Sequence, residues 1–358
     1  MDFSSLEKYL LQCLNMSLDA DSSETSYTNS FTVKIEEKGF KWIPRMPTTL
    51  LINADLYQKI YEIANIALYP EYTLLKENSA YVVPENLEDI HIERALFFPW
   101  KKGIPQRIKF KNLLENISNT NNQDIIPLMK NLILDYNKVT SMAIAGNSGS
   151  GKSYFLTYLL TLLNSFSDLI IVDPKMDSPA RWAREFEVKA LFPLSNRSKS
   201  DFISQINDEL SLALNIIYQR QRQLYANPHL TFKNYTIVID EVLALTEGVN
   251  KSIKGAFYAL LTQIALMGRA TNVHLILVSQ RFDHNTIPVS VREQLNVLIQ
   301  LGNINAKTTQ FLFPDFEPSG IVIPPGKGTG LIQIIDDIHP YQVQPFLAPT
   351  YNLEGVTI

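Results

Sequence analysis

The sequence predicts an α/β fold in which a parallel sheet is covered by helices on both faces, with a smaller α+β region before it. Short apolar runs that suit buried strands alternate with longer helix-like segments from about residue 125 onward. A glycine-rich loop at residues 146–153 stands between the first of the core apolar runs and a helix-like segment. The length of 358 residues allows about two domains with buried cores.

Composition and charge narrow the class of protein. Hydrophobic residues make up 46% of the chain and charged residues 19%, as in ordinary folded proteins. The net charge of −4 provides no global basic field, so contact with DNA would have to be local. One cysteine, Cys13, excludes an internal disulfide framework. Neither a membrane span nor a signal peptide is recognisable, so we expect a cytoplasmic protein that reaches a membrane only through a partner.

Residues 1–110 are expected to form the smaller, N-terminal accessory region. They begin with an amphipathic helix candidate, continue through a polar loop at residues 19–30, and then include strand-like pieces such as "FTVKIEE". A basic cluster follows near the end of this region, and it suits either a solvated surface or contact with a phosphate backbone. Its members are Lys101, Lys102, Arg107, Lys109 and Lys111.

Residues 111–358 are expected to form the larger domain. Its strands are predicted at "SMAIAG", "DLIIVD", "YTIVID", "VHLILVSQ" and "NVLIQLG". The segment 201–225 carries apolar residues near helical spacing, which predicts one long covering helix. Together with the glycine-rich loop, these elements indicate a three-layer P-loop NTPase domain of the RecA-like type.

The glycine-rich loop fits G-x-x-x-x-G-K-[ST] in the strand, loop and helix context that this motif needs. Its glycines let consecutive backbone N–H groups point at a phosphate, and the following helix adds its positive end. Lys152 is expected to reach the β- and γ-phosphates, and Ser153 to ligate Mg²⁺. The predicted nucleotide-binding residues are Gly146, Asn147, Ser148, Gly149, Ser150, Gly151, Lys152, Ser153 and Tyr154.

Two carboxylates follow the apolar strand "YTIVID". Asp240 and Glu241 stand at its carboxyl end, where α/β sheets build their sites. Asp240 is expected to hold the Mg²⁺ shell, and Glu241 to orient or deprotonate the attacking water.

The next strand ends at Gln280, which could sense the γ-phosphate. Arg269 precedes that strand and is a candidate arginine finger for a neighbouring subunit, or an ordinary surface arginine.

Taken together, these motifs resemble the motor domain of the FtsK/SpoIIIE family of DNA translocases. "IAGNSGSGKS" is similar to its P-loop, "IIVDPKMDSP" to its Asp-Pro-Lys segment, and "IVIDEVLAL" to its Asp-Glu motif. "GRATNVHLILVSQR" resembles its Arg-Ala, strand and Gln-Arg signature, although Phe282 stands where proline usually follows. The short chain and its segment "VREQLNVLIQLGN" look most like the short FtsK-type proteins of Gram-positive conjugative elements and plasmids.

The resemblance implies a ring-shaped homo-hexamer that threads double-stranded DNA through its pore and binds ATP with Mg²⁺ between subunits. It assigns catalytic roles to Lys152, Asp240, Glu241, Arg269 as a finger in trans, and Gln280 as the sensor. Pore loops would fall at residues 220–234 and 282–293, with DNA contacts at Arg220, Arg222, Lys233 and Arg292. A relaxase or a membrane transfer complex is the partner that such proteins serve.

Two alternatives to a DNA translocase remain open. The chain could be a nucleotide-gated adaptor that recruits relaxase or replication proteins, or a related ring helicase or secretion ATPase. Glu241 and Arg269 favour turnover over gating, since a gate needs no catalytic carboxylate. The segment "PPGKGTGLIQI" at residues 324–334 lacks the P-loop spacing, so it is expected to form a tight turn between edge strands without a chemical role.

Overall fold

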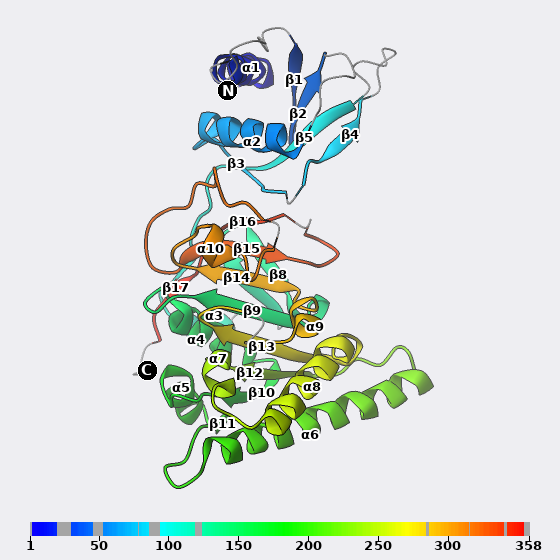
Figure 1. Ribbon diagram of the computed structural model, residues 1–358, viewed down its shortest axis with the longest axis vertical. Helices are drawn as coiled ribbons and strands as arrows, with labels where there is room; N and C mark the ends of the chain where they lie inside the picture. Colours follow the sequence, from blue (N-terminus) through cyan, green and yellow to red (C-terminus); the bar gives the residue numbers. More distant parts are fainter. Residues whose placement is uncertain are drawn as a thin grey trace. The chain divides into compact units, whose positions relative to one another are not determined.

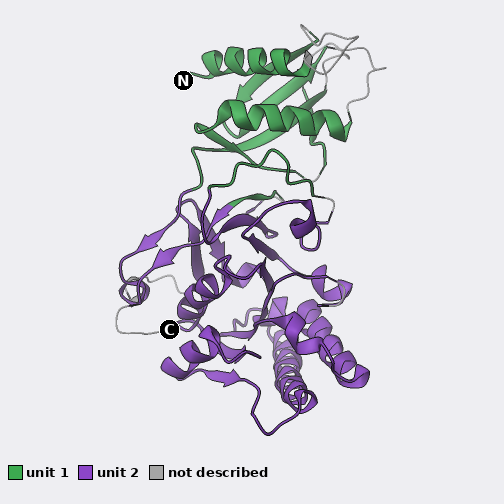
Figure 2. Ribbon diagram, turned by 60° about the vertical axis from the view of Figure 1, so that its left-hand side comes forward, with its two compact units in different colours: residues 1–105, 315–324, 341–345 green, residues 106–314, 325–340, 346–358 purple. Residues whose placement is uncertain are grey.

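The computed structural model describes residues 2–19, 30–45, 53–77, 79–85, 94–118, 124–283, 286–314, 316–339 and 342–353. The chain forms two compact units (Figure 2). The first comprises Met1–Pro105, Asp315–Pro324 and Tyr341–Pro345, and the second comprises Gln106–Pro314, Pro325–Pro340 and Phe346–Ile358.

The predicted boundary after residue 110 therefore differs from this division, because two C-terminal segments belong with the N-terminal unit. Hydrogen bonds within that unit explain why. The Asn65 side chain donates to the carbonyl of Gly320 at 2.6 Å. The backbones of Lys76 and Val343 form an antiparallel bridge with two 3.0 Å hydrogen bonds. A linear division of the sequence misses such contacts because their partners are more than 250 residues apart.

The first unit packs two helices against an antiparallel sheet. Its strands run in the order β1 (Phe31–Glu36), β2 (Gly39–Pro44), β5 (Arg94–Lys102) and β3 (Tyr72–Leu74), and β4 (Val82–Pro84) also pairs with β5. Its helices are α1 (Phe3–Asp19) and α2 (Ala54–Leu68). Leucines spaced four apart place one buried face on α1, namely Leu6, Leu10, Leu14 and Leu18. The expected amphipathic helix and the strand at "FTVKIEE" are both present.

The second unit is built on an eight-stranded sheet in the order β11-β10-β12-β13-β9-β14-β15-β16 (Figure 1). The strands are β9 (Ser141–Gly146), β10 (Ser167–Val172), β11 (Lys189–Leu191), β12 (Asn234–Ile239), β13 (Val273–Ser279), β14 (Val297–Leu301), β15 (Thr329–Ile334) and β16 (Gln344–Leu347). The six strands from β11 to β14 are parallel, and β15 pairs antiparallel with β14. The prediction of a parallel sheet is confirmed, with an antiparallel addition at one edge.

Helices cover both faces of this sheet (Figure 1). Helices α4 (Lys152–Leu163) and α5 (Ser178–Glu185) pack on one face together with the hairpin β7 (Ile125–Met129) and β8 (Leu132–Asp135). Helices α6 (Lys199–Ala226) and α8 (Lys251–Met267) pack against each other on the other face. The long helix predicted at residues 201–225 corresponds to α6, which begins with a Ser198–Asp201 capping box.

Short elements complete the second unit. They are α3 (Leu113–Ser118), α7 (Val242–Thr246), α9 (Val289–Arg292), α10 (Ala306–Thr309), the 3₁₀ turns η1 (Tyr136–Lys138) and η2 (Arg269–Thr271), and the parallel pair β6 (Lys109–Phe110) and β17 (Thr350–Tyr351). Within the described ranges, no helix is both long and apolar enough to span a bilayer.

Candidate nucleotide-binding site

The glycine-rich loop connects β9 to α4, and its conformation depends on glycine. Gly151 is the N-cap of α4 and has a φ of 102°, in the left-handed region that residues with a side chain rarely adopt. A Cβ atom at this position would also lie 2.9 Å from the backbone nitrogen of Gly328. The first N–H groups of α4 have no acceptors within the helix, and with the helix dipole they favour an anion at this end.

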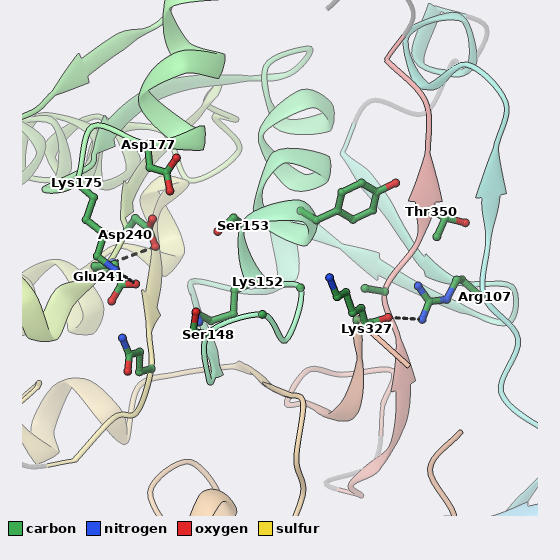
Figure 3. A pocket seen from close by; sticks show the side chains of 16 residues that line it. Arg107, Ser148, Lys152, Ser153, Lys175, Asp177, Asp240, Glu241, Lys327 and Thr350 are labelled. Atoms are coloured by element: carbon green, nitrogen blue, oxygen red, sulfur yellow. Dashed lines mark hydrogen bonds and ion pairs between the residues drawn. The ribbon is translucent and has the colours of Figure 1, made fainter. Parts of the chain in front are cut away.

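A cavity of about 570 Å³ opens beside this loop, and all of its lining residues belong to the second unit. It brings together nine of the predicted site residues: Ser148, Gly149, Gly151, Lys152, Ser153, Tyr154, Asp240, Glu241 and Gln280. Figure 3 shows the P-loop residues in the middle, with Asp240 and Glu241 on one side and Arg107 and Lys327 on the other. The cavity therefore has two chemically distinct ends.

The Lys152 side chain is folded onto its own loop. Its ammonium donates to the carbonyl of Gly146 at 2.5 Å and to that of Asn147 at 3.2 Å. Burial lowers the pKa of Lys152. Phosphate oxygens are stronger acceptors for an ammonium than neutral carbonyls are, so Lys152 is placed to exchange these bonds for a phosphate. Gly146, Asn147 and Ser150 support the loop without lining the cavity.

Asp240 is the most strongly perturbed carboxyl group of the cavity. It is 7% exposed at the end of β12. Burial, followed by the nearby carboxylates of Asp173 and Glu241, raises the pKa of Asp240 to about 7. A buried carboxylate of this kind gains most from a cation, and Mg²⁺ prefers oxygen ligands from one or two protein groups plus nucleotide phosphates. Ser153 lines the same cavity, so the residues present fit the predicted Mg²⁺ site.

Within the described part of the chain, no cluster of three or more His, Cys, Asp or Glu residues could hold a metal ion by itself. A Mg²⁺ ion would therefore need ligands from the bound nucleotide in addition to Ser153 and Asp240. This is the usual arrangement in phosphoryl-transfer sites, where the protein supplies few of the ligands.

Glu241 is held by a residue to which the sequence interpretation gave no role. Its Oε1 atom lies 2.5 Å from Nζ of Lys175, which also lines the cavity. Lys175 belongs to the "DPK" segment after β10, and Asp173 organises that segment by accepting backbone N–H bonds from Lys175, Asp177 and Ala180 at 2.8–3.1 Å. Glu241 itself has a φ of 47°, which is rare for a residue with a side chain.

Gln280 follows β13, the strand that pairs with β9. Ser279 lies opposite Ala145 in this parallel register, so the next residue, Gln280, reaches the cavity beside the P-loop. Its place is compatible with contact to a terminal phosphate. The sensor role stays a prediction.

The other end of the cavity was missed from the sequence. Arg107, Lys327, Gly328, Ala348 and Thr350 line it. The expectation that residues 324–334 take no part in the site is therefore corrected: the Gly328 N–H donates to the Ser150 carbonyl at 2.8 Å, which attaches this turn to the P-loop. Of the basic cluster noted in the sequence, Arg107 donates to the Lys327 carbonyl at 2.8 Å.

Arg269 lies far from the cavity of its own chain. It belongs to η2, directly before the amino end of β13, whereas the P-loop follows the carboxyl end of the parallel neighbour β9. Its guanidinium is 63% exposed and lies 3.8 Å from Asp337. The seven residues of β13 separate Arg269 from Gln280 by roughly 20 Å. Arg269 therefore does not line the cavity of its own chain, and its role in trans stays a prediction.

The four predicted DNA contacts differ in their surroundings. Arg220 donates to the carbonyl of Thr271 at 2.6 Å and lies over the Phe232 ring, so these contacts hold its side chain against the fold, and its role as a DNA contact stays a prediction. Lys233 pairs with Asp168 at 2.5 Å, and Arg292 donates to the Phe282 carbonyl at 3.3 Å. Arg222 is exposed near the end of α6.

The two predicted pore loops are covered unequally by the structure. The loop at residues 220–234 is described throughout. Of the loop at residues 282–293, positions 284 and 285 lie outside the described residues.

Known proteins share part of the sequence and the fold. No protein-family model matches the chain. It is 26% identical over 200 residues to the FtsK domain-containing protein YdcQ of Bacillus subtilis (strain 168), across 54% of this chain and 40% of that protein. It is 24% identical over 241 residues to the DNA translocase FtsK of Chlamydia pneumoniae, across 59% of this chain and 29% of that protein. The resemblance to FtsK-type ATPases is confirmed.

The fold agrees with this resemblance over nearly the whole chain. The structure of the pCW3 conjugation coupling protein TcpA, in a monomer form with ATPγS, matches 97% of this chain and 96% of its own with a TM-score of 0.54. The sequence identity is 17%, so this match concerns the fold alone. The chain has the fold of a P-loop ATPase, and its match spans less than half the length of either curated relative.

Proposed function

We propose that this FtsK-type chain hydrolyses ATP with Mg²⁺. The observation that carries the proposal is the joint presence of Lys152, Ser153, Asp240 and Glu241 in one cavity. Lys152 would bind the β- and γ-phosphates, and Ser153 and Asp240 would hold Mg²⁺, which would supply positive charge for the phosphoryl group in transfer. Glu241 orients the attacking water and accepts its proton.

The energy of hydrolysis is proposed to move double-stranded DNA. The names of the relatives, a DNA translocase and a conjugation coupling protein, support this function. We place the chain in a mobile element, where it couples DNA to transfer or to plasmid maintenance, with a relaxase or a membrane transfer complex as partner. We propose a homo-hexameric ring in which Arg269, which is exposed and does not line its own cavity, completes the site of the next subunit.

Steady-state ATPase assays with and without duplex DNA test this proposal. We expect Mg²⁺-dependent turnover that duplex DNA stimulates, and loss of turnover in Lys152→Ala. Lys175→Arg is the control for Lys152→Ala, because it changes another lysine of the cavity and retains the positive charge beside Glu241. Nucleotide binding without any turnover, with or without DNA, would instead favour the nucleotide-gated adaptor.

A further inference from the structure

The cavity end opposite Asp240 and Glu241 is assembled from three segments that are distant in sequence. Arg107 precedes β6, Lys327 and Gly328 precede β15, and Thr350 belongs to β17. Figure 3 shows Lys327, Thr350 and Arg107 gathered on one side of the P-loop. In the proposed function, Mg²⁺ and the terminal phosphate lie at the carboxylate end. The remainder of the nucleotide must therefore extend toward this second end.

An aromatic ring at this end is held in a fixed orientation. Tyr154 follows Ser153 in α4 and stacks on Tyr351, with ring centroids 4.4 Å apart. Its hydroxyl donates to the Tyr351 carbonyl and accepts from the Tyr351 backbone N–H, both at 2.8 Å. The Tyr351 hydroxyl in turn donates to the Tyr154 carbonyl at 2.8 Å. These bonds fix the ring before any ligand arrives, so little conformational entropy would be lost on stacking.

Tyr154 is accessible at the wall of the cavity. Tyr154 remains 43% exposed although Tyr351 stacks on it, and it is one of the lining residues. An aromatic surface of this kind is the group on which nucleobases stack in proteins, because every base presents a π-face. Phosphates alone would gain nothing from it.

A turn closes this end of the cavity on the side of β15. The Gly328 N–H donates to the Ser150 carbonyl at 2.8 Å, and the Ala348 N–H donates to the Gly328 carbonyl at 2.7 Å. Arg107 binds the Lys327 carbonyl and so fixes the position of the turn. The exposed Lys327 ammonium adds positive charge where the ester-linked phosphate and ribose would pass.

From this geometry we propose that Tyr154 is the stacking platform for the nucleobase, and that the Lys327–Gly328 turn, positioned by Arg107, encloses the nucleoside. The subsite rests on the proposed nucleotide site and adds to it the part that recognises the nucleoside. It accepts a planar base by contact area, and the phosphates bind independently at the P-loop.

The test compares ATP with ribose 5-triphosphate, which lacks the base, by isothermal titration without Mg²⁺, so that neither compound is hydrolysed. Wild-type protein should bind ATP roughly five- to a hundred-fold more tightly than ribose 5-triphosphate, the range expected for one base–aromatic stack. Tyr154→Leu should lose this preference while binding ribose 5-triphosphate as wild type does. Tyr154→Phe, which keeps the ring, should retain most of the preference.

The outcomes separate the subsite from the proposed nucleotide site. If wild type binds neither compound, or Lys152→Ala binds both normally, the nucleotide site itself is wrong. If wild type binds both equally, or Tyr154→Leu keeps the full preference for ATP, the stacking proposal is overturned while the P-loop assignment survives. Tyr154→Met provides a second aliphatic variant, with circular dichroism as the check on folding. Equal binding of the two compounds by wild type overturns the proposal without any variant, and Tyr154→Phe tests the role of the ring if neither aliphatic variant folds.

Discussion

Replacement of Arg269 by alanine should abolish turnover without loss of ATP binding, although Arg269 touches no residue of its own cavity. The guanidinium lies at the amino end of β13, and the cavity lies at the carboxyl ends of the same parallel strands. In a closed ring the interfaces are heterologous, so one edge of each subunit faces a different surface of the next. Arg269 can then complete the neighbour's site.

The expected magnitudes differ for stability and for rate. The Arg269–Asp337 pair is 3.8 Å long, and both side chains are more than 60% exposed, so its loss should change the free energy of unfolding by less than about 1 kcal/mol. An arginine finger contributes about 10³- to 10⁵-fold to turnover, because it stabilises charge mainly in the transition state. A folded, ATP-binding protein with almost no turnover is therefore expected.

Mixed rings provide the assay. Arg269→Ala and Glu241→Gln protomers are each inactive alone, but in a random equal mixture roughly one interface in four combines an intact Glu241 with an intact Arg269 from the next subunit. ATPase activity should partly return on mixing. A double variant that carries both changes is the matched control and should rescue neither. Absence of recovery in rings shown by mass spectrometry to be mixed would refute the role in trans.

Four other outcomes are expected. Glu241→Gln should lower kcat by about 10²- to 10⁴-fold with ATP binding retained, and a loss of binding in titration calorimetry would contradict this assignment. Lys152→Ala should lose ATP binding itself, and normal affinity would refute its role. Burial lowers the pKa of His274 to about 3. Between about pH 6.5 and 3 the unfolded state therefore binds one proton more than the folded state, and the free energy of unfolding falls as the pH falls through that window. The free energies of unfolding of wild type and His274→Gln in urea should differ by an amount that shrinks on acidification, and a constant difference would oppose this reasoning. Arg222→Ala should reduce the salt dependence of duplex binding by about one unit of slope, whereas Arg220→Ala should lower Tm instead, and the reverse result would exchange their roles.

The carboxylate end of the cavity, around Asp240 and Glu241, could be predicted from the sequence because its residues follow buried strands. Lys152, Asp240 and Gln280 each come after an apolar run, and the carboxyl ends of parallel strands meet at one edge of a sheet. Hydrophobic pattern therefore determined both the strands and the places of the polar residues after them. Lys175 was quoted within the Asp-Pro-Lys segment, but its contact with Glu241 depends on the fold of the loop around Asp173.

The cavity end around Arg107 and Lys327 could not be predicted in this way. Arg107 and Lys327 lie 220 positions apart, and their contact depends on a single bond to a backbone carbonyl, which has no sequence pattern. The glycines around Gly328 predict a turn, but the bond from this turn to Ser150 has no sequence pattern either. The bonds from Arg220 to the carbonyls of Thr271 and Asn272 likewise have no sequence pattern, since a basic side chain near a helix end predicts only an accessible charge.

The two ends of the cavity are held by different sets of interactions, and this difference determines which part of the protein a bound nucleotide stabilises most. The carboxylate end follows the central strands β12 and β13, which are buried and paired on both sides. The end around Arg107 and Lys327 is joined to the last strands of the chain by the Gly328–Ser150 and Ala348–Gly328 backbone bonds and by three hydrogen bonds between Tyr154 and Tyr351. These bonds are fewer than the backbone pairs that hold the central strands. The binding free energy of a nucleotide that contacts both ends therefore has its larger effect on these bonds. ATP should therefore stabilise the attachment of the C-terminal segments to the P-loop more than it stabilises the central strands.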